Sequence, residues 1–366
     1  MSILPRALLA FCLVLALLPV ASGSPLDCSE LPEPERWEEP TEPDAGRADM
    51  TIAAHRGAAE LAPENTLDAY RYAIAYGVDM IEVDVQQTLD GRYVSFHDQT
   101  VDRKTDGEGY IATMTYEEVR SLNAAANDKW RGTEYDPAQI PSLEEVLELA
   151  ASTGTGIYFD IKESVTHPVG VADMADRYGV MDDSAFLTYD PGRAAAIRAK
   201  HLDAQLMLSN ADPNIPPAAL YAFGQDYTWF GSSLPNYDAG KIAAIHDACG
   251  LAIPNVYQGD VTGSEDGDLL FARSIGADGA QVNEPDLVAD ALDEPVPTEL
   301  VVEGAAVCLV NRDNGMGLPE KPLKVNGDHL VTGKGGCVSL PDGFRAGRIS
   351  FEGDGSALAS SKISAP

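Results

Sequence analysis

The sequence predicts a TIM (β/α)8 barrel followed by a small all-β segment with the character of a sandwich. After Met50, short apolar runs alternate with amphipathic stretches, and eight such units occupy about 240 residues, the number and length typical of this barrel. From about Glu299 the helical pattern stops, and short apolar runs lie between Asn-Gly, Asp-Gly and Gly-Gly turns. A doubly wound open sheet is the alternative architecture for the first part.

The first 49 residues are expected to lie outside both folded parts. An apolar run from Ala7 to Val20 follows Arg6 and precedes small residues, so residues 1–23 are predicted to be a cleaved secretory signal peptide. The run is shorter than the ~20 residues that span a bilayer, which argues against the alternative of an uncleaved anchor and against stable membrane insertion after cleavage. Residues 24–49 combine five prolines with nine acidic residues and are predicted to be a linker. The expected location is therefore secreted or periplasmic.

The barrel is expected between residues 50 and 298. Its predicted strands are Thr51–His55, Met80–Val85, Ile157–Ile161, Ala185–Thr188, Gln205–Leu208, Thr228–Gly231, Leu251–Val256 and Gly279–Val282. Its predicted helices include Asn65–Tyr76, Ser142–Ala151, Gly192–His201, Asp238–Cys249 and Asp268–Ile275. Because the chemistry of such barrels lies at the carboxyl ends of the strands, reactive residues are expected at these ends.

Residues 299–366 are predicted to be a small β-rich domain, for which the sequence indicates no function. Its expected strands are Val301–Val302, Ala306–Val310, Pro322–Val325 and Cys337–Leu340. Outside the predicted signal peptide the chain holds Cys28, Cys249, Cys308 and Cys337, an even number that suits disulfides in an exported chain. We expect Cys308 to pair with Cys337, because both lie in this domain.

The chain is strongly acidic, with 58 Asp and Glu residues against 25 Lys and Arg and a formal net charge of -33. Such a charge repels the phosphate backbone of nucleic acids and anionic lipid headgroups, so neither is an expected partner. Residues 50–298 hold 41 acidic and 15 basic residues, whereas residues 299–366 hold 8 and 7. The negative charge is therefore concentrated on the predicted barrel. The sequence gives no indication of the oligomeric state.

Three carboxylates are expected at neighbouring strand ends. Glu82 and Asp84 are two residues apart on one strand, so their side chains point to the same face, and Asp160 lies on the next barrel strand. Carboxylates that share a face repel one another unless a proton or cation lies between them. Such a set suits a hard cation, Mg²⁺ or Ca²⁺, whereas zinc would require His or Cys ligands. These three residues are the candidate metal ligands, and a solvated acidic edge is the alternative.

Two histidines are expected beside this cluster. His55 ends the first strand. The Asp90-Gly91 dipeptide indicates a two-residue hairpin turn, and a short strand Arg92–Phe96 would then place His97 opposite Asp84. Two histidines that flank a metal centre suit general acid and base catalysis near neutral pH. We interpret the remaining histidines as structural: His167, His201, His246 and His329.

Two basic residues accompany these groups. Arg56 follows His55, and Gly57 allows a close turn of the backbone at that point. Either Arg56 and Lys162 bind phosphate oxygens of a substrate, or they balance the charge of the carboxylates. Asn65 is predicted to be the N-cap of the helix that follows, with Asp68 completing a capping-box-like pair.

Taken together, these residues resemble the glycerophosphodiester phosphodiesterase family. The matching motifs are His-Arg-Gly at 55–57, Pro-Glu-Asn-Thr at 63–66, Glu-Val-Asp-Val at 82–85, Thr-Leu-Asp-Gly at 88–91, His-Asp at 97–98, Val-Asp-Arg-Lys-Thr-Asp-Gly-Glu-Gly at 101–109, Thr-Tyr-Glu-Glu-Val at 115–119 and Ile-Pro-Ser-Leu-Glu-Glu-Val-Leu at 140–147. The resemblance extends from Met50 to Leu292, and the predicted C-terminal domain lies outside it.

The resemblance implies a TIM barrel with a small insertion after the second strand. It also implies that the chain hydrolyses glycerophosphodiesters to sn-glycerol 3-phosphate and an alcohol with one divalent cation. By motif, His55 and His97 would be the acid-base pair, and Glu82 and Asp84 would be metal ligands. Which histidine is the acid stays open, as does whether water or the substrate's own glycerol hydroxyl attacks phosphorus.

Three positions depart from the family pattern. Asp160 stands where the family usually has glutamate, which shortens the reach of the third carboxylate by one methylene. The family's Trp-Thr pair on the seventh strand is missing from Ile253–Tyr257, and Asn283–Pro285 replace its usual Thr-Asp-x-Pro. The last two departures concern the substrate rim, so they leave the alcohol specificity more open than the reaction type.

Two alternative functions are considered. A related barrel phosphodiesterase could act on intact phospholipids, as sphingomyelinase D and phosphatidylinositol-specific phospholipase C do. The second alternative belongs to a different functional class. It is an exported binding protein whose barrel has lost activity and whose C-terminal domain carries the function. The complete set of His55, His97, Glu82 and Asp84 argues against the second alternative.

Overall fold

The computed structural model describes residues 50–364, apart from residues 128, 210–226, 248–249, 293–295, 304–305, 320, 326–327, 341–345 and 352–359. The predicted signal peptide and linker, Cys28 and Cys249 lie outside the described residues. Among the helices that are described, none is long and apolar enough to cross a membrane.

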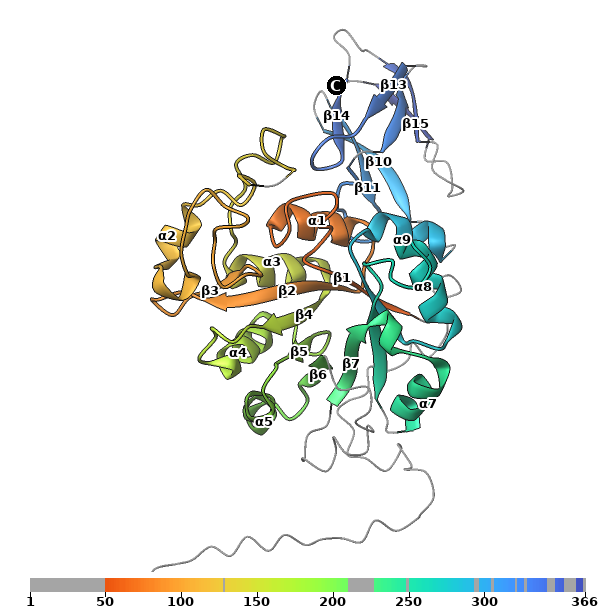
Figure 1. Cartoon of the computed structure of the whole chain (residues 1–366). Coiled ribbons are helices and arrows are strands. Elements are labelled where there is room, and N and C mark those ends of the chain that lie inside the picture. Colours follow the sequence, from red (N-terminus) through yellow and green to blue (C-terminus); the bar gives the residue numbers. More distant parts are fainter. Residues whose placement is uncertain are drawn as a thin grey trace, which may run out of the picture.

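Eight parallel strands form the barrel (Figure 1). They are β1 (Thr51–Ala54), β2 (Met80–Gln87), β4 (Gly156–Ile161), β5 (Ala185–Leu187), β6 (Gln205–Ser209), β7 (Tyr227–Ser233), β8 (Leu251–Asn255) and β9 (Gly279–Val282). Each strand pairs with the next, and β1 pairs with both β2 and β9. This double pairing closes the sheet, so the predicted barrel is confirmed over the alternative of an open sheet.

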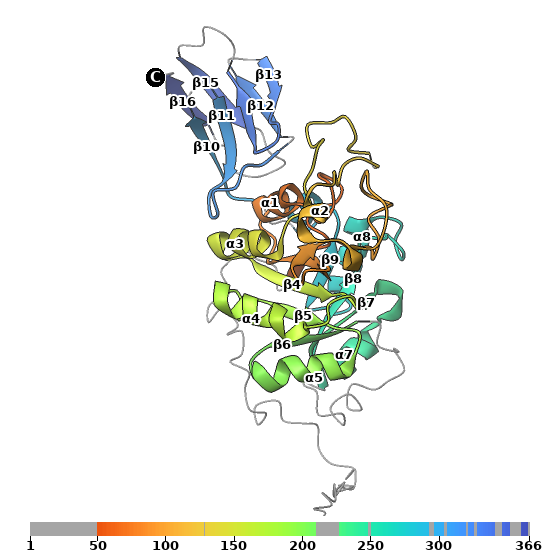
Figure 2. The same cartoon turned by 90° about the vertical axis from the view of Figure 1, so that its left-hand side faces the viewer.

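Helices cover the outside of the barrel (Figures 1 and 2). Those described are α1 (Leu67–Ala75), α3 (Leu143–Thr153), α4 (Pro168–Tyr178), α5 (Pro191–Lys200), α7 (Ala239–Asp247), α8 (Glu265–Ser274) and α9 (Pro285–Ala291). Local sequence explains their ends: Ser142 and Glu145 form a capping box at the start of α3, and Gly154 ends that helix in the left-handed conformation. The helices α4 and α9 were not among those predicted.

The start of α1 differs from the prediction. Its N-cap is Thr66, whose side chain accepts a hydrogen bond from the backbone N–H of Ala69. Asn65 is instead buried with a φ of 57°, and its side chain points to the barrel strands. Asp68 forms ion pairs with Arg71 and Lys334 and takes no part in capping. The prediction was wrong because Asn and Thr are both good caps, and only the backbone angles distinguish them.

The predicted insertion lies between β2 and α3. It contains β3 (Tyr93–Ser95), a short 3-10 helix (Ile111–Thr113) and α2 (Tyr116–Arg120). The strand β3 pairs antiparallel with the carboxyl-terminal residues of β2, Val85–Gln87. The insertion has its own buried apolar cluster, which includes Val94, Val101, Ile111, Val119 and Ile140.

The hairpin between β2 and β3 is offset by one residue from the predicted register. Val85 pairs with Ser95, and the backbone N–H of Phe96 donates to the carbonyl of Asp84 at 2.9 Å, so Asp84 faces Phe96 rather than His97. The loop has three residues, because Thr88 pairs with Arg92 and Gly91 adopts a φ of 82°. A three-residue loop that ends in a left-handed glycine is a common hairpin connection, and the Asp-Gly dipeptide alone does not exclude it.

The C-terminal residues form two antiparallel sheets (Figure 2). One holds β10 (Thr298–Glu303), β11 (Ala306–Asn311) and β14 (Cys337–Ser339), and the other holds β12 (Pro322–Val325), β13 (Asp328–Val331), β15 (Ala346–Phe351) and β16 (Ser360–Ser364). Leu309 of the first sheet and Leu323 of the second belong to one buried cluster, as expected of a sandwich-like arrangement. Cys308 lies opposite Cys337 and forms the predicted disulfide with it.

The two-sheet domain packs against the carboxyl end of α1. Two asparagine side chains from this domain donate hydrogen bonds to backbone carbonyls in the last turn of α1: Asn311 to Ala75 at 3.0 Å and Asn314 to Ile74 at 2.6 Å. The last carbonyls of a helix have no partner within the helix, so they need such donors when they are buried. Tyr76 joins the apolar cluster of the C-terminal sheets.

Candidate active site

Three consecutive residues follow the first strand and lie at the mouth of the barrel. His55, Arg56 and Gly57 follow β1, and the φ angles of Arg56 and Gly57 are 56° and 79°. A Cβ atom at position 57 would lie 2.7 Å from the backbone of Ala69, so only glycine lets this loop approach α1 so closely. The turn brings the backbone N–H of Arg56 to Glu82, whose Oε2 accepts it at 2.7 Å.

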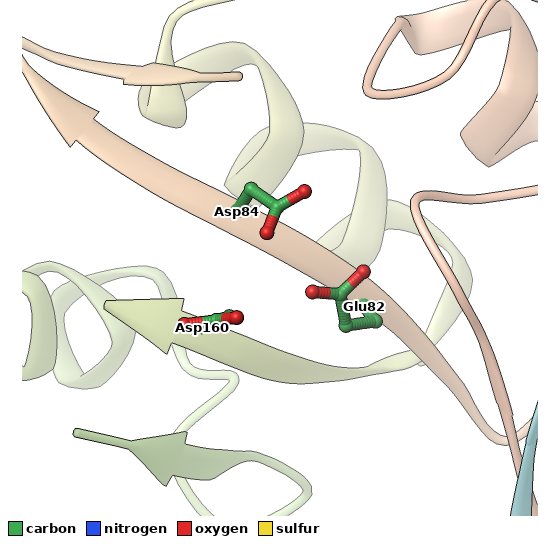
Figure 3. Close-up of side chains that lie close together, drawn as sticks. All are labelled: Glu82, Asp84 and Asp160. Carbon is green, nitrogen blue, oxygen red and sulfur yellow. The ribbon is translucent and has the colours of Figure 1, made fainter. Parts of the chain in front are cut away.

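The three predicted metal ligands lie together in the structure (Figure 3). Glu82 and Asp84 come from β2 and Asp160 comes from β4, and all three are buried. Asp84 and Asp160 are direct partners in the parallel pairing of the two strands. One carboxylate oxygen from each residue lies within 4.8 Å of the other two.

Burial and mutual repulsion set the charge state of this cluster. Burial raises the pKa of Glu82 well above its usual range, and the charges of Asp84 and Asp160 raise it further. Burial also raises the pKa of Asp160. For Asp84 burial acts in the same direction, but Lys162 and Arg56 outweigh it and lower the pKa below its usual range. Burial and the neighbouring carboxylates therefore favour the protonated form of Glu82 when no cation is bound.

The residues present fit a divalent cation. Oxygen atom Oδ1 of Asp160 is buried and accepts no hydrogen bond from the part of the chain that the structure describes. Arg56 and Lys162 supply two positive charges against three carboxylates, which leaves the cluster negative when all of them are ionised. Carboxylate oxygens are the ligands that Mg²⁺ and Ca²⁺ take in proteins. Glu82, Asp84 and Asp160 could therefore hold one such ion.

Both predicted basic residues lie against the carboxylates. The Nζ atom of Lys162 is 2.6 Å from Asp84 Oδ1 and 2.6 Å from Asp160 Oδ2. Arg56 contacts Asp84 through Nε at 3.4 Å and Glu64 through Nη1 at 3.2 Å. Both basic residues therefore balance part of the negative charge of the carboxylates. Arg56 in addition lines the cavity beside the site.

Asn65 supports Asp84 from the start of α1. Its Nδ2 donates to Asp84 Oδ2 at 2.7 Å, while its Oδ1 accepts from the hydroxyls of Tyr70 and Ser95, each at 2.9 Å. The positive φ of Asn65 turns the side chain inward, which a capping asparagine would not do. The amide thus fixes one carboxylate of the cluster.

The ring of His55 is held in a defined orientation. Its Nδ1 lies 2.8 Å from Oδ1 of Asn283, and Tyr257 stacks on its face. An amide oxygen only accepts hydrogen bonds, so Nδ1 carries the hydrogen and Nε2 presents a lone pair. Burial and, after it, the charge of Arg56 lower the pKa of His55 to about 4. The imidazole is therefore neutral at pH 7.

His97 has a charged partner instead. Its Nδ1 lies 2.7 Å from Oδ1 of Asp98, and Arg103 binds both oxygens of that carboxylate at 2.6 and 3.0 Å. Gln86 donates hydrogen bonds to the carbonyls of both His97 and Asp98. His97 also contributes to the lowered pKa of Asp84, although it is not its partner in the hairpin. The hydrogen bond to Asp98 thus orients the ring of His97.

Glu64 connects the surroundings of the two histidines. It pairs with Arg56, with Arg103 at 3.2 Å and with Lys104 at 3.1 Å. Arg103 and Lys104 belong to the insertion, whereas Glu64 and Arg56 belong to the loop after β1. These ion pairs therefore fasten the insertion to the barrel beside the candidate site.

A cavity of about 280 Å³ opens next to His55. Its walls are mainly polar and carry both charges, and they are formed by His55, Arg56, Ala59, Glu60, Glu64, Lys104, Lys129 and Asn283. Neither His97 nor Lys162 lines it. The cavity is thus placed to receive a polar or charged molecule against His55 and Arg56.

Sequence reasoning did not identify several of these residues. Gln86 could have been identified as a residue of the site, because it continues the two-residue spacing of Glu82 and Asp84 on the same strand. Tyr257 and Asn283 were named only as departures from a family pattern. Their contacts with His55 bridge more than 200 positions in the sequence, which no local pattern encodes.

Comparison with known proteins gives a consistent result. The sequence profile of the "Glycerophosphoryl diester phosphodiesterase family" matches residues 55–251. Glycerophosphodiester phosphodiesterase 1 of Mus musculus is 43% identical over 126 residues, which cover 34% of this chain and 36% of that protein. A glycerophosphodiester phosphodiesterase of Caldanaerobacter subterraneus is 38% identical over 122 residues, which cover 33% and 49%. The chain thus spans less than half the length of these curated relatives.

Solved structures show the same fold. A glycerophosphodiester phosphodiesterase from Agrobacterium tumefaciens superposes with a TM-score of 0.58 at 24% identity, covering 66% of this chain and 99% of that one. A phosphodiesterase from Oleispira antarctica, solved in complex with the product sn-glycerol-3-phosphate, superposes with a TM-score of 0.56 at 23% identity, covering 66% and 96%.

Proposed function

Because the chain belongs to the glycerophosphoryl diester phosphodiesterase family, we propose that it hydrolyses glycerophosphodiesters to sn-glycerol 3-phosphate and an alcohol. One observation carries the proposal. A neutral histidine, an arginine and three buried carboxylates meet beside a polar cavity at one end of the barrel. The product bound in the Oleispira antarctica phosphodiesterase supports a small phosphate ester as the ligand.

A divalent cation, Mg²⁺ or Ca²⁺, would be held by Glu82, Asp84 and Asp160. When bound, such an ion polarises phosphoryl oxygens and offsets the charge that develops at phosphorus. Arg56 faces the cavity and is the proposed ligand of a phosphate oxygen. Lys162 bridges two carboxylates, which supports a role in balancing their charge.

His55 is the proposed base and His97 the proposed acid. Nε2 of neutral His55 takes a proton from the attacking hydroxyl while the new oxygen–phosphorus bond forms. His97, held by Asp98, gives a proton to the oxygen of the leaving alcohol as its bond to phosphorus breaks. If the attacking group is the glycerol hydroxyl, a cyclic phosphate forms, and water then opens it with the two histidines in reversed roles.

The direct test is release of sn-glycerol 3-phosphate from a panel of glycerophosphodiesters, including glycerophosphocholine, with Mg²⁺, Ca²⁺, Mn²⁺ or EDTA. We expect His55→Ala and His97→Ala each to lower kcat at least 100-fold, as loss of general acid or base catalysis does. His201→Ala is the matched control, since His201 contacts Asp173 at 2.8 Å, away from the site. Full activity in either of the first two variants would contradict the assignment.

The same assay separates the alternatives. Intact phospholipids are included beside their deacylated forms, and hydrolysis of the intact lipids alone would replace the proposal with the lipid phosphodiesterase alternative. Tight cation binding without turnover of any diester would instead support an inactive binding protein. Trapping of a cyclic glycerophosphate at early times distinguishes attack by the glycerol hydroxyl from attack by water.

We also propose that the protein is secreted or periplasmic. The support is the signal-peptide pattern of residues 1–23, together with the disulfide between Cys308 and Cys337, since disulfides persist in oxidising compartments. N-terminal sequencing of the mature protein from cell fractions tests this, and an intact Met1 on protein from the cytoplasm would contradict it.

A further inference from the structure

Glu265 is a buried carboxylate that the proposed mechanism does not use. It contacts the residues that follow β9, the last strand of the barrel. Glu265 is in the first turn of α8 and is only 9% exposed. A single oxygen of its side chain, Oε1, accepts hydrogen bonds from the backbone N–H groups of Asn283 and Glu284, each at 2.8 Å. These two residues form the connection between β9 and α9.

This connection carries the partner of His55. The pairing of β1 with β9 ends where the backbone N–H of His55 donates to the carbonyl of Val282 at 2.7 Å. The next residue is Asn283, whose Oδ1 lies 2.8 Å from Nδ1 of His55. The backbone N–H of Asn283 donates to Glu265, and α9 begins after it with Pro285. Glu265 therefore binds the backbone of the residue whose side-chain amide contacts His55.

We propose that Glu265 is a positioning residue that acts on His55 through Asn283. By holding the backbone at positions 283 and 284, it keeps Oδ1 of Asn283 within hydrogen-bond distance of Nδ1. The ring then stays in the tautomer that carries its hydrogen on Nδ1 and a lone pair on Nε2. The inference rests on the proposed function only in so far as it concerns catalysis, because the geometry of the ring can be measured without substrate.

In this proposal Glu265 positions the backbone through its acceptor oxygen, Oε1, and not through its charge. Burial raises the pKa of this carboxyl to about 7, against the two hydrogen bonds that favour the ionised form. A proton on Oε2 leaves Oε1 able to accept both hydrogen bonds. Glutamine offers the same carbonyl oxygen at nearly the same place, whereas alanine offers none. The two substitutions therefore separate hydrogen-bond positioning from electrostatics.

The experiment compares Glu265→Ala and Glu265→Gln with the unaltered full chain. Asp278→Ala is the matched control, because Asp278 accepts the backbone N–H of Ala252 at 2.7 Å just before the other end of β9. All proteins are labelled with ¹⁵N-histidine, and the His55 resonances are assigned from their loss in His55→Gln. Ring nitrogen shifts then report the tautomer, and steady-state kinetics with glycerophosphocholine and Mg²⁺ report kcat and KM.

We expect Glu265→Ala to lose the single Nδ1–H signature of His55 and to lower kcat by about 10-fold or more, with KM changed less than about threefold, as misplacement of a catalytic group does. Glu265→Gln should keep the signature and at least about a third of kcat. Asp278→Ala should keep both, even if its melting temperature falls.

Two results would overturn the inference. One is an unchanged His55 tautomer and kcat in Glu265→Ala. The other is a Glu265→Gln protein, folded by circular dichroism, that is as impaired as Glu265→Ala. If the unaltered chain hydrolyses no glycerophosphodiester, the proposed function fails, but the nitrogen shifts still decide whether Glu265 positions His55.

Discussion

The imidazole of His55 lies flat on the ring of Tyr257, with the ring centroids 4.1 Å apart and the planes inclined by 4°. Asn283 fixes the same imidazole within its plane, at Nδ1. One contact thus sets the plane of the ring and the other sets its rotation in that plane. Both partners come from the last two strand ends of the barrel, far from His55 in the sequence.

The stacked ring predicts a difference between two substitutions at position 257. Tyr257→Ala removes the stacking surface and opens space beside the imidazole, so we expect kcat to fall about 10-fold or more. Tyr257→Phe keeps the ring. Among the residues that the structure describes, the hydroxyl makes one long hydrogen bond, 3.3 Å from Asn255 Nδ2, so we expect kcat to stay within about threefold. Equal losses in both variants would point to the hydroxyl and contradict the stacking argument.

The lowered pKa of His55 predicts the acid side of the pH profile. A base must be neutral, and the shift of the pKa from 6.5 to about 4 keeps the ring neutral through pH 5. We therefore expect kcat/KM to fall only as pH approaches 4, whereas an unshifted histidine would lose activity below 6.5. Burial is the main cause, Arg56 adds to it, and Asp84, Glu64 and the amide of Asn283 act in the opposite direction.

Asn283→Asp tests this explanation. A carboxylate at position 283 would stabilise the imidazolium and raise the pKa of His55, so the acid limb of kcat/KM should move to higher pH by about one unit or more. Asn255→Asp places a new carboxylate on the neighbouring strand end and serves as a control for general charge effects. An acid limb that stays in place in Asn283→Asp would show that His55 is not the group that titrates.

Cation binding is expected to release protons. Burial and the two acidic neighbours raise the pKa of Glu82 well above its usual range, so we expect Glu82 to bind a proton without the cation and to release it when the cation binds. Titration calorimetry at pH 7 in two buffers of different ionisation enthalpy measures the protons released by Mg²⁺ or Ca²⁺. Glu82→Gln should abolish the release and weaken binding, whereas Asp183→Asn, another acid with a raised pKa, should do neither. Binding without any proton release would contradict this account of Glu82.

Arg103 is expected to support His97 through Asp98. It binds both oxygens of Asp98 and also contacts Glu64, so its loss removes one of the ion pairs that link the insertion to the loop after β1. We predict that Arg103→Ala lowers kcat by about 10-fold, and that Arg103→Lys does not restore it fully because lysine cannot form a two-pronged contact. Arg92→Ala is the matched control, since Arg92 is also in the insertion, is similarly exposed and pairs with Glu144. Equal effects at both arginines would indicate a general weakening of the insertion.

The C-terminal domain is expected to stabilise α1. Asn311→Ala leaves the buried carbonyl of Ala75 without its donor, and we predict a loss of about 1–3 kcal/mol in the free energy of unfolding, as for an unpaired buried polar group. Urea denaturation measures the loss. Asn236→Ala, which removes a bond within a single short segment, should cost less. An equal stability of Asn311→Ala and the unaltered chain would show that this hydrogen bond to α1 contributes nothing.

The amino-acid pattern is sufficient to predict the barrel, the two-sheet C-terminal segment and the cluster of Glu82, Asp84 and Asp160. These features follow from periodicity, because spacing along a strand fixes which side chains share a face, and because the carboxyl ends of parallel strands meet at one rim. The pairing of Cys308 with Cys337 also followed, since both lie in one small domain.

The partners that surround the reactive groups depend on how the chain folds and could not be predicted from local patterns. The partner of His55 is Asn283, 228 residues away, because closure of the barrel places β9 beside β1. The conformation of Gly91 decided that the hairpin loop has three residues and shifted the register by one. The backbone angles of Asn65 decided that it holds Asp84 and does not cap α1. A sequence pattern specifies the face on which a side chain lies, but contacts between distant strand ends depend on how the sheet closes and on single backbone angles.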